Sequence, residues 1–236
     1  NNIITPNKHY IHYNIHKHLA TNNIINYDGN KILYCFESLI VPTVSYNGNT
    51  NMGLFNSKNS LQNLKKLLLQ YFEFKDSECN RIYDVHNYDR NKYTYIFIFD
   101  RKQSSHRRWE NSHVFINYLH NHKNYNKTFY IKYMDYDFLH LTIKDQFLQF
   151  YCMNFGIIAH GWIATMMTVM HNNSTIIEMC CEGFSWAGRG DFKTMLGIEL
   201  IVPYIKCPNI EKHEDDFNMT ISTLKNLIIN SNNNFL

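Results

Sequence analysis

Short runs of β-branched and aromatic residues alternate with longer segments whose apolar residues recur at helical spacing. The runs typical of strands lie at residues 31–42, 93–99, 128–133, 155–159, 174–179 and 198–202. Helices are predicted at residues 60–72, 110–120, 144–153, 162–170, 191–196 and 220–229. Strands that alternate with helices of this length form βαβ units. The sequence therefore predicts an α/β fold, with a Rossmann-like parallel sheet and helices on both of its faces.

Changes in composition divide the chain into three predicted parts. Residues 75–91 are polar and charged, and they are the best candidate for a domain boundary. The predicted parts are residues 1–85, residues 91–210 with the regular alternation of strands and helices, and residues 215–236 with a C-terminal helix and a disordered tip.

The composition fits a folded protein with a sizeable core. Of the 236 residues, 44% are hydrophobic and 15% are aromatic, which excludes global disorder. The formal net charge of +3 is small and evenly spread, so we expect no nucleic acid partner. No apolar run approaches the roughly 20 residues that a membrane-spanning helix needs. We therefore expect no membrane span in this chain.

The histidines and cysteines do not form a known metal motif. His12 and His16 have the i, i+4 spacing of one helix face, but Tyr13 stands where a zinc protease has its carboxylate. The six cysteines contain no C-x-x-C pair, which argues against a structural zinc site. Their even number permits disulfides but does not place them. Cys152 and Cys180 lie in apolar surroundings, so we expect both to be buried small hydrophobic residues.

Four N-x-[ST] sequons occur in the sequence, which is rich in Asn throughout. They begin at Asn126, Asn172, Asn173 and Asn218. A chain with so much Asn contains several such triplets by chance, so the sequons by themselves are weak support for glycosylation.

The segment from Gly156 to Met179 carries the clearest chemical pattern. A short buried strand leads to His160 and Gly161, and an apolar helix follows at once. A glycine lets the backbone approach a ligand closely, and a helix N-terminus favours phosphate. The next strand ends with Glu178, whose carboxylate can accept both hydroxyls of a ribose. Doubly wound sheets bind ligands at the carboxyl ends of their strands. The structural alternative is a His-Gly turn with a Glu that caps a helix.

A longer pattern includes, in chain order, Arg101 in YIFIFDR, Arg107 or Arg108 and Asn111 in SHRRWEN, Gln146 in KDQF, His160-Gly161-Trp162, and Glu178 in TIIEM. In order and spacing these positions resemble glycosyltransferase family 61, whose H-G-A-x-L motif matches His160-Gly161-Trp162. Upstream, CFESLIVP resembles the family's Cys-Phe strand, and downstream FKTMLGIELI resembles its last helix and strand. Trp162 departs from the family pattern, which has a small Ala there.

The resemblance implies a GT-B architecture of two Rossmann-like domains. Residues 1–85 would then be the C-terminal part of an N-terminal, acceptor-side domain, and residues 91–210 the domain that binds a nucleotide-sugar. The implied donor is a UDP-sugar, the implied acceptor is a glycan or protein hydroxyl, and transfer inverts the anomeric centre. Eukaryotic members work in the lumen of the secretory pathway. No cofactor is implied.

The resemblance also assigns roles to individual residues. Arg101 and Arg107 would stabilise the departing diphosphate, because guanidinium groups contact phosphate in a bidentate manner. The residues expected to contact the donor are His160, Gly161, Trp162, Glu178, Asn111 and Gln146. No residue is assigned as the general base. The alternative for the arginines is a basic surface loop, RKQSSHRR, which lacks interleaved stacking aromatics for nucleic acid.

Two further alternatives follow from the same residues. The first is a catalytically inactive Rossmann-like binding or structural module, which Trp162 and the short N-terminal half suggest. The second is a metal-bound diphosphate, because Asp135-Tyr136-Asp137 formally fits the Asp-x-Asp pattern of GT-A enzymes. These aspartates follow the second strand without a small residue beside them, so we expect a solvated loop and donor binding without a metal ion.

Overall fold

The computed structural model describes residues 4–5, 25–26, 58–101, 108–160, 162–181, 196–205 and 219–230. The chain divides into two compact units, Asn1–Asn47 and Gly48–Leu236. In the first unit, strands β1 (Ile4–Thr5) and β2 (Ile25–Asn26) pair in parallel. The second unit contains all the other described elements. The predicted division into an acceptor-side domain and a nucleotide-sugar domain stays a prediction.

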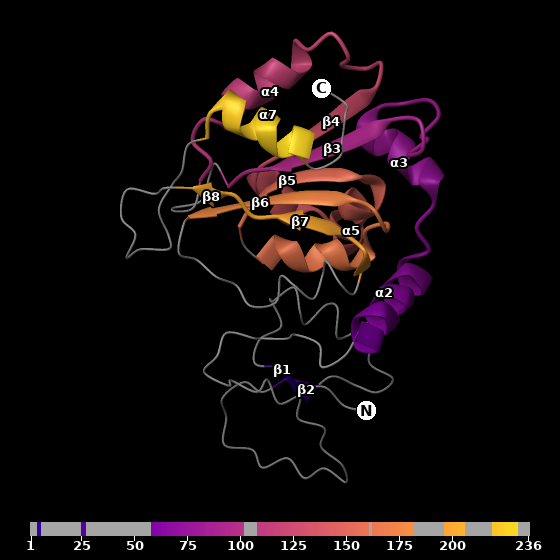
Figure 1. Ribbon diagram of the computed structural model, residues 1–236. Helices are drawn as coiled ribbons and strands as arrows, with labels where there is room; N and C mark the ends of the chain where they lie inside the picture. Colours follow the sequence, from indigo (N-terminus) through magenta and orange to yellow (C-terminus); the bar gives the residue numbers. More distant parts are fainter. Residues whose placement is uncertain are drawn as a thin grey trace. The chain divides into compact units, whose positions relative to one another are not determined.

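A parallel sheet forms the centre of the second unit (Figure 1). Its strands are β3 (Thr94–Phe99), β4 (Phe129–Met134), β5 (Phe155–Ala159), β6 (Thr175–Cys181) and β7 (Glu199–Ile201), in the order β4-β3-β5-β6-β7. A short strand, β8 (Tyr204–Ile205), also pairs in parallel with β6. The strand order reverses between β3 and β5, because β4 lies on one side of β3 and all later strands lie on the other. The predicted Rossmann-like α/β sheet is confirmed.

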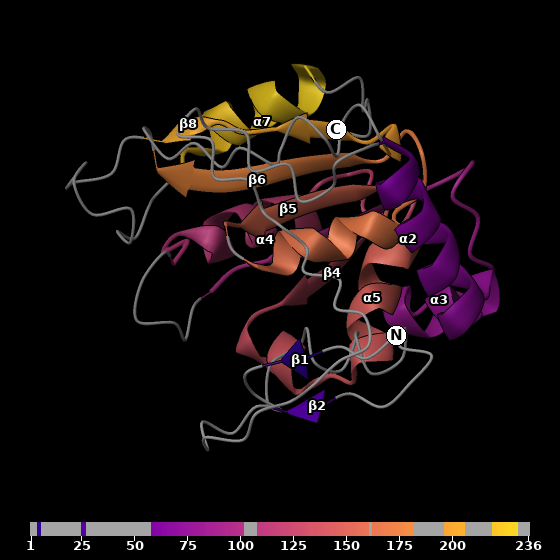
Figure 2. The same ribbon diagram turned by 90° about the horizontal axis from the view of Figure 1, so that it is seen from below.

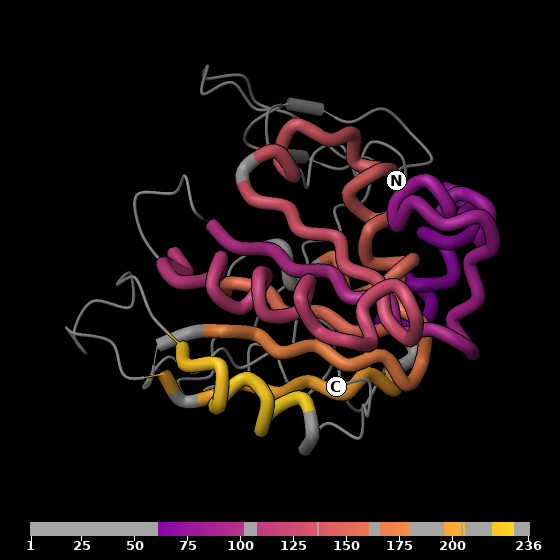
Figure 3. The backbone as a smooth tube through the Cα atoms, turned by 90° about the horizontal axis from the view of Figure 1, so that it is seen from above, coloured from indigo at the N-terminus to yellow at the C-terminus, as the bar shows by residue number. Residues whose placement is uncertain are grey.

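Helices cover both faces of this sheet, as Figures 1 and 2 show. Helices α4 (Ser112–His120) and α7 (Ile221–Asn230) pack together on one face, onto which Figure 3 looks. The other face carries α5 (Ile143–Cys152), the 3-10 helix η2 (Trp162–Val169), α2 (Lys58–Phe72) and α3 (Asp76–Tyr83).

Strand β3 is buried on both faces of the sheet. Its side chains alternate between the two faces, as they must in any strand. Ile96 and Ile98 belong to the core that includes Phe115 of α4. Tyr95 and Phe97 point the other way, where the ring of Phe97 lies 5.5 Å from that of Phe150 on α5. A strand covered on both sides has no polar face, and this explains the unbroken aromatic and β-branched run.

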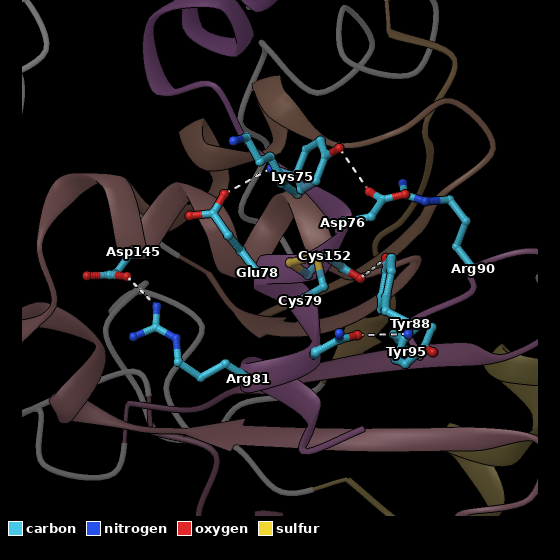
Figure 4. The surroundings of a disulfide bond; sticks show 12 residues. Lys75, Asp76, Glu78, Cys79, Arg81, Tyr88, Arg90, Tyr95, Asp145 and Cys152 are labelled. Carbon is cyan, nitrogen blue, oxygen red and sulfur yellow. Dashed lines mark hydrogen bonds and ion pairs between the residues drawn. A yellow bond between two sulfur atoms is a disulfide. The ribbon is translucent and has the colours of Figure 1, made fainter. Parts of the chain in front are cut away.

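The polar segment at residues 75–91, in which a domain boundary is predicted, contains helix α3. This helix packs against α5, and a disulfide joins Cys79 of α3 to Cys152 at the end of α5 (Figure 4). Cys152 is buried as expected, and the disulfide, which the sequence permitted without placing it, gives it a covalent partner as well. Helices α2 and α3 belong to the same unit as the sheet.

The remaining differences concern element boundaries and one short helix. Helix α2 begins at Lys58, ahead of its predicted start at residue 60. The predicted loop after β4 includes a 3-10 helix, η1 (Tyr136–His140). The strand predicted at residues 31–42, most of the helix predicted at 191–196 and the histidines at 9–18 lie outside the described residues. In the described part of the chain, no helix combines the length and apolar character that crossing a membrane requires.

Candidate functional site at the carboxyl edge of the sheet

The carboxyl ends of β3 and β5 lie side by side where the strand order reverses. Their register pairs Phe99 with Ile158, so the residues that follow leave the sheet next to each other. Such a point opens a crevice between the loops that turn to opposite faces, and doubly wound proteins bind ligands there. Arg101 follows β3 and His160 follows β5.

Arg101 contacts the turn that follows β5. Its guanidinium Nη1 donates a hydrogen bond of 3.3 Å to the carbonyl oxygen of His160, across a separation of 59 residues. The Arg101 side chain is half-buried. The structure thus joins the first predicted arginine to the His-Gly turn. Since a guanidinium carries five N–H donors, it can contact this carbonyl and an anion at the same time.

His160 is held by its backbone and by its side chain. The backbone N–H donates to the carbonyl of Met179 at 2.8 Å and extends the pairing of β5 with β6. The ring Nδ1 lies 2.5 Å from Oε1 of Glu178. A carboxylate only accepts hydrogen bonds, so Nδ1 donates in this contact. The carboxylate therefore fixes the orientation of the His160 ring.

Glu178 lies deeper than its position in the sequence suggested. Its partner in the register is Ile158, and β6 continues past it to Cys181. The side chain of Glu178 is 0% exposed, and that of His160 is 9% exposed. Glu178 does not cap a helix, and it does not end its strand. Its carboxylate is positioned to hold the imidazole of His160, which follows the carboxyl end of β5.

Sequence reasoning missed Asp100, a fully buried carboxylate beside the same turn. Its Oδ2 accepts a short hydrogen bond from the hydroxyl of Ser112, the first residue of α4, and one of 2.9 Å from Tyr133 near the end of β4. Burial, followed by the charge of Asp100, raises the pKa of the Tyr133 hydroxyl, which stays a neutral donor. Asp100 ties β3, β4 and α4 together beside Arg101. A charged residue directly after a buried strand was the signal available in the sequence.

The side chain of Asn111 connects two helices. Its Oδ1 accepts from Trp109 Nε1 at 2.8 Å and from the backbone N–H of Met219 at 3.0 Å, and its Nδ2 donates to the Met219 carbonyl at 2.7 Å. Asn111 therefore holds the start of α4 to the segment before α7. All of these contacts are made within the protein. The resemblance predicts that Asn111 contacts the sugar donor, and that role stays a prediction.

Gln146 is buried in the first half of α5. Its Nε2 donates to the carbonyl of Leu141 at 3.1 Å, and its buried Oε1 has no hydrogen-bond partner among the described residues.

Arg107 and Gly161 lie outside the described residues, as does the side chain of Trp162. Arg108, the other candidate for the second arginine, is half-buried.

Asp135 and Asp137 form a local turn. Asp135 Oδ1 accepts from the backbone N–H of Asp137 at 3.3 Å, at the start of η1. Within the described part of the chain, no three His, Cys, Asp or Glu residues gather as metal ligands would.

No family model and no curated protein matches this sequence. The function proposed for the chain therefore depends on the arrangement of Arg101, His160 and Glu178 and on the pattern that resembles glycosyltransferase family 61.

Proposed function

We propose that the chain is an inverting glycosyltransferase that binds a nucleotide-sugar, a UDP-sugar, at the carboxyl edge of the sheet. It would transfer the sugar to a hydroxyl group of a glycan or a protein. One observation carries the proposal: the Arg101 guanidinium contacts the His160 carbonyl at the reversal of strand order. Two segments expected to contact the donor phosphates meet at the place where such sheets bind nucleotides.

The electrostatics of this edge suit a leaving diphosphate. Negative charge grows on the diphosphate as the bond to the sugar breaks, and fixed donors aimed at that charge stabilise the transition state. Arg101 supplies a permanent positive charge with planar N–H donors. His160 adds an imidazole whose orientation does not change during the reaction, because Glu178 holds it. In this proposal the phosphates need no metal ion.

The proposal changes the role of Glu178. We infer that this carboxylate positions His160 and does not contact the ribose, because its side chain is fully buried. His160 then contacts the donor directly. No described residue is assigned as the general base that removes the proton of the acceptor hydroxyl.

Titration calorimetry with UDP tests the proposal. Arg101→Lys should weaken UDP binding about tenfold or more, because Lys lacks the planar fork. Arg81→Lys is the matched control: Arg81 is 74% exposed and pairs with Asp145 on the outer surface of α3 and α5. Its UDP affinity should equal that of the wild type. Absence of UDP binding, or full affinity in Arg101→Lys, contradicts the proposal.

A catalytically inactive nucleotide-binding or structural module is the second candidate. Two side chains expected to contact the donor, Asn111 and Glu178, bind groups of the protein itself. Release of UDP from a panel of UDP-sugars separates the two candidates. A chain that binds UDP and releases none from any UDP-sugar, with or without acceptor hydroxyls, supports the inactive module.

A further inference from the structure

The disulfide between Cys79 and Cys152 indicates the compartment in which the chain folds. Both cysteines are fully buried, and their Cα atoms are 5.4 Å apart across a sequence separation of 73 residues. The hydroxyl of Tyr88 donates to the Cys152 carbonyl at 2.5 Å, and Tyr88 and Tyr95 lie beside the bond (Figure 4). Such bonds form and persist in oxidising compartments such as the lumen of the secretory pathway. The same compartment glycosylates accessible sequons.

We propose that Asn126 carries an N-linked glycan. The triplet Asn126-Lys127-Thr128 forms the tight turn before β4, and all three residues are exposed. Asn126 adopts the left-handed conformation with φ 56°, which Asn tolerates better than most residues. Its backbone N–H donates to the Phe129 carbonyl at 2.9 Å, which holds the turn. No described residue forms a hydrogen bond with its side-chain amide, so a sugar can be attached without the loss of a contact.

The Thr128 hydroxyl is equally accessible. A sequon works only when its third residue offers a hydroxyl to the transferring enzyme together with the Asn amide. Thr128 Oγ1 makes one long bond, 3.5 Å to the carbonyl of Asn124, at the outer limit of hydrogen-bond distances. Asn126 and Thr128 therefore present both required groups on one exposed turn.

The other described sequons lack this combination. Asn172 accepts a hydrogen bond from Lys65 Nζ at 3.2 Å, and the third residue of its sequon, Ser174, is 1% exposed. The sequon of Asn173 ends with Thr175, which is 2% exposed and donates its hydroxyl to Glu199 at 3.1 Å. Asn218 lies outside the described residues.

The chemistry of the modification is a transfer from a lipid-linked oligosaccharide diphosphate. A bond forms between Asn126 Nδ2 and C1 of the first sugar, and the bond between that C1 and the diphosphate oxygen breaks. The amide nitrogen loses one proton, and the lipid diphosphate leaves. No oxidant or reductant takes part.

The turn at Asn126 and the candidate donor site lie at opposite edges of the sheet. Asn126 precedes β4, so it lies at the amino edge of the parallel sheet, whereas Arg101 and His160 follow β3 and β5 at the carboxyl edge. A glycan on Asn126 leaves the candidate site uncovered. Loss of the glycan should therefore leave UDP binding unchanged.

Peptide N-glycosidase treatment of the full-length protein, isolated from the cells that produce it, tests the inference. The enzyme removes an N-linked glycan and converts the modified Asn to Asp, which peptide mass spectrometry locates. We expect a mobility shift and an Asp at position 126. Asn126→Asp and Thr128→Ala, introduced in the same cells, should lose the glycan at this turn. Thr128→Ser keeps the hydroxyl and should retain it.

The paired variants make the outcome decisive. Asn126→Asp retains a residue that tolerates the left-handed conformation, and Thr128→Ala leaves Asn126 itself intact. Asn172→Asp is the control for a sequon whose third residue is buried, and it should keep the wild-type shift. No glycan on the wild-type protein, or a glycan on Asn172 or Asn173 with none on Asn126, overturns the inference.

Discussion

The imidazole Nδ1 of His160, which directly follows β5, lies 2.5 Å from Oε1 of Glu178 on β6, and both side chains are buried. The pair connects the core of the sheet to its carboxyl edge. Arg101 contacts the backbone of the same histidine. A substitution of Glu178 should therefore alter the positions of both His160 and Arg101 in the predicted phosphate site.

Replacement of the buried carboxylate by an amide should weaken ligand binding through His160. Glu178→Gln keeps the size of the side chain but loses a charged hydrogen-bond acceptor, which is worth about 1–3 kcal/mol. We expect UDP binding to weaken by that amount in titration calorimetry. Glu199→Gln, on the neighbouring strand β7, is the matched control and should bind UDP like the wild type. Unchanged affinity in Glu178→Gln, with a native circular dichroism spectrum, argues against the positioning role.

Loss of the Asp100 carboxylate should destabilise the fold. Asp100→Asn replaces an acceptor that binds the Ser112 and Tyr133 hydroxyls at a fully buried position. The free energy of unfolding, measured with urea, should fall by about 1.5–3 kcal/mol. Asp84→Asn, at an exposed left-handed position with φ 51°, should change it by less than about 0.5 kcal/mol. Equal losses in the two variants are incompatible with the anchoring role of Asp100.

The disulfide should contribute substantially to stability. With a sequence separation of 73 residues, the loop-entropy model gives about 4 kcal/mol for the Cys79–Cys152 bond. The double variant Cys79→Ser/Cys152→Ser should lose about 2–5 kcal/mol of unfolding free energy. Reductant should destabilise the wild type by a similar amount. Urea titrations of the double variant with reductant separate this bond from any formed by the other cysteines, and equal stability of wild type and double variant contradicts the prediction.

Metal removal should not affect the donor site. Asp135 and Asp137 are engaged in a local turn, and the proposed phosphate contacts come from Arg101 and the turn at His160. UDP binding and sugar transfer should therefore be the same with and without EDTA, and the same in Asp135→Asn and Asp137→Asn. Abolition by EDTA, restored by manganese and reproduced by either Asn variant, would require a metal-dependent site instead.

The local elements follow directly from the order of residues. The strand β5 occupies the predicted residues, Phe155–Ala159, and β3 begins one residue after the predicted start, at Thr94. These segments are buried on both faces, so nearly every residue in them is β-branched, aromatic or small. The same reasoning placed Arg101 and His160 after two strands of a parallel sheet, which is enough to predict that they share an edge.

Helix α3 has the apolar spacing of a helix, although no helix is predicted there. Its buried residues Cys79, Ile82 and Tyr83 have the i, i+3, i+4 spacing of one helix face, but five of its eight residues are polar or charged. The polar composition therefore favours a boundary segment over a helix, because only three apolar residues indicate the helix. A helix this short is stable because it packs against α5, since helices of fewer than about 12 residues are marginal by themselves.

The amino-acid sequence by itself determined the α/β class, the main strands and helices, and the edge at which the candidate site lies, because these depend on periodicity and on the direction of parallel strands. Only the tertiary structure decided which distant residues meet: Cys79 with Cys152, Asp100 with Ser112 and Tyr133, and Glu178 with His160. The physical reason is that these contacts depend on strand order, register and burial. Glu178 serves as an example, because its register opposite Ile158 puts the carboxylate inside the strand rather than at its end, next to the imidazole of His160.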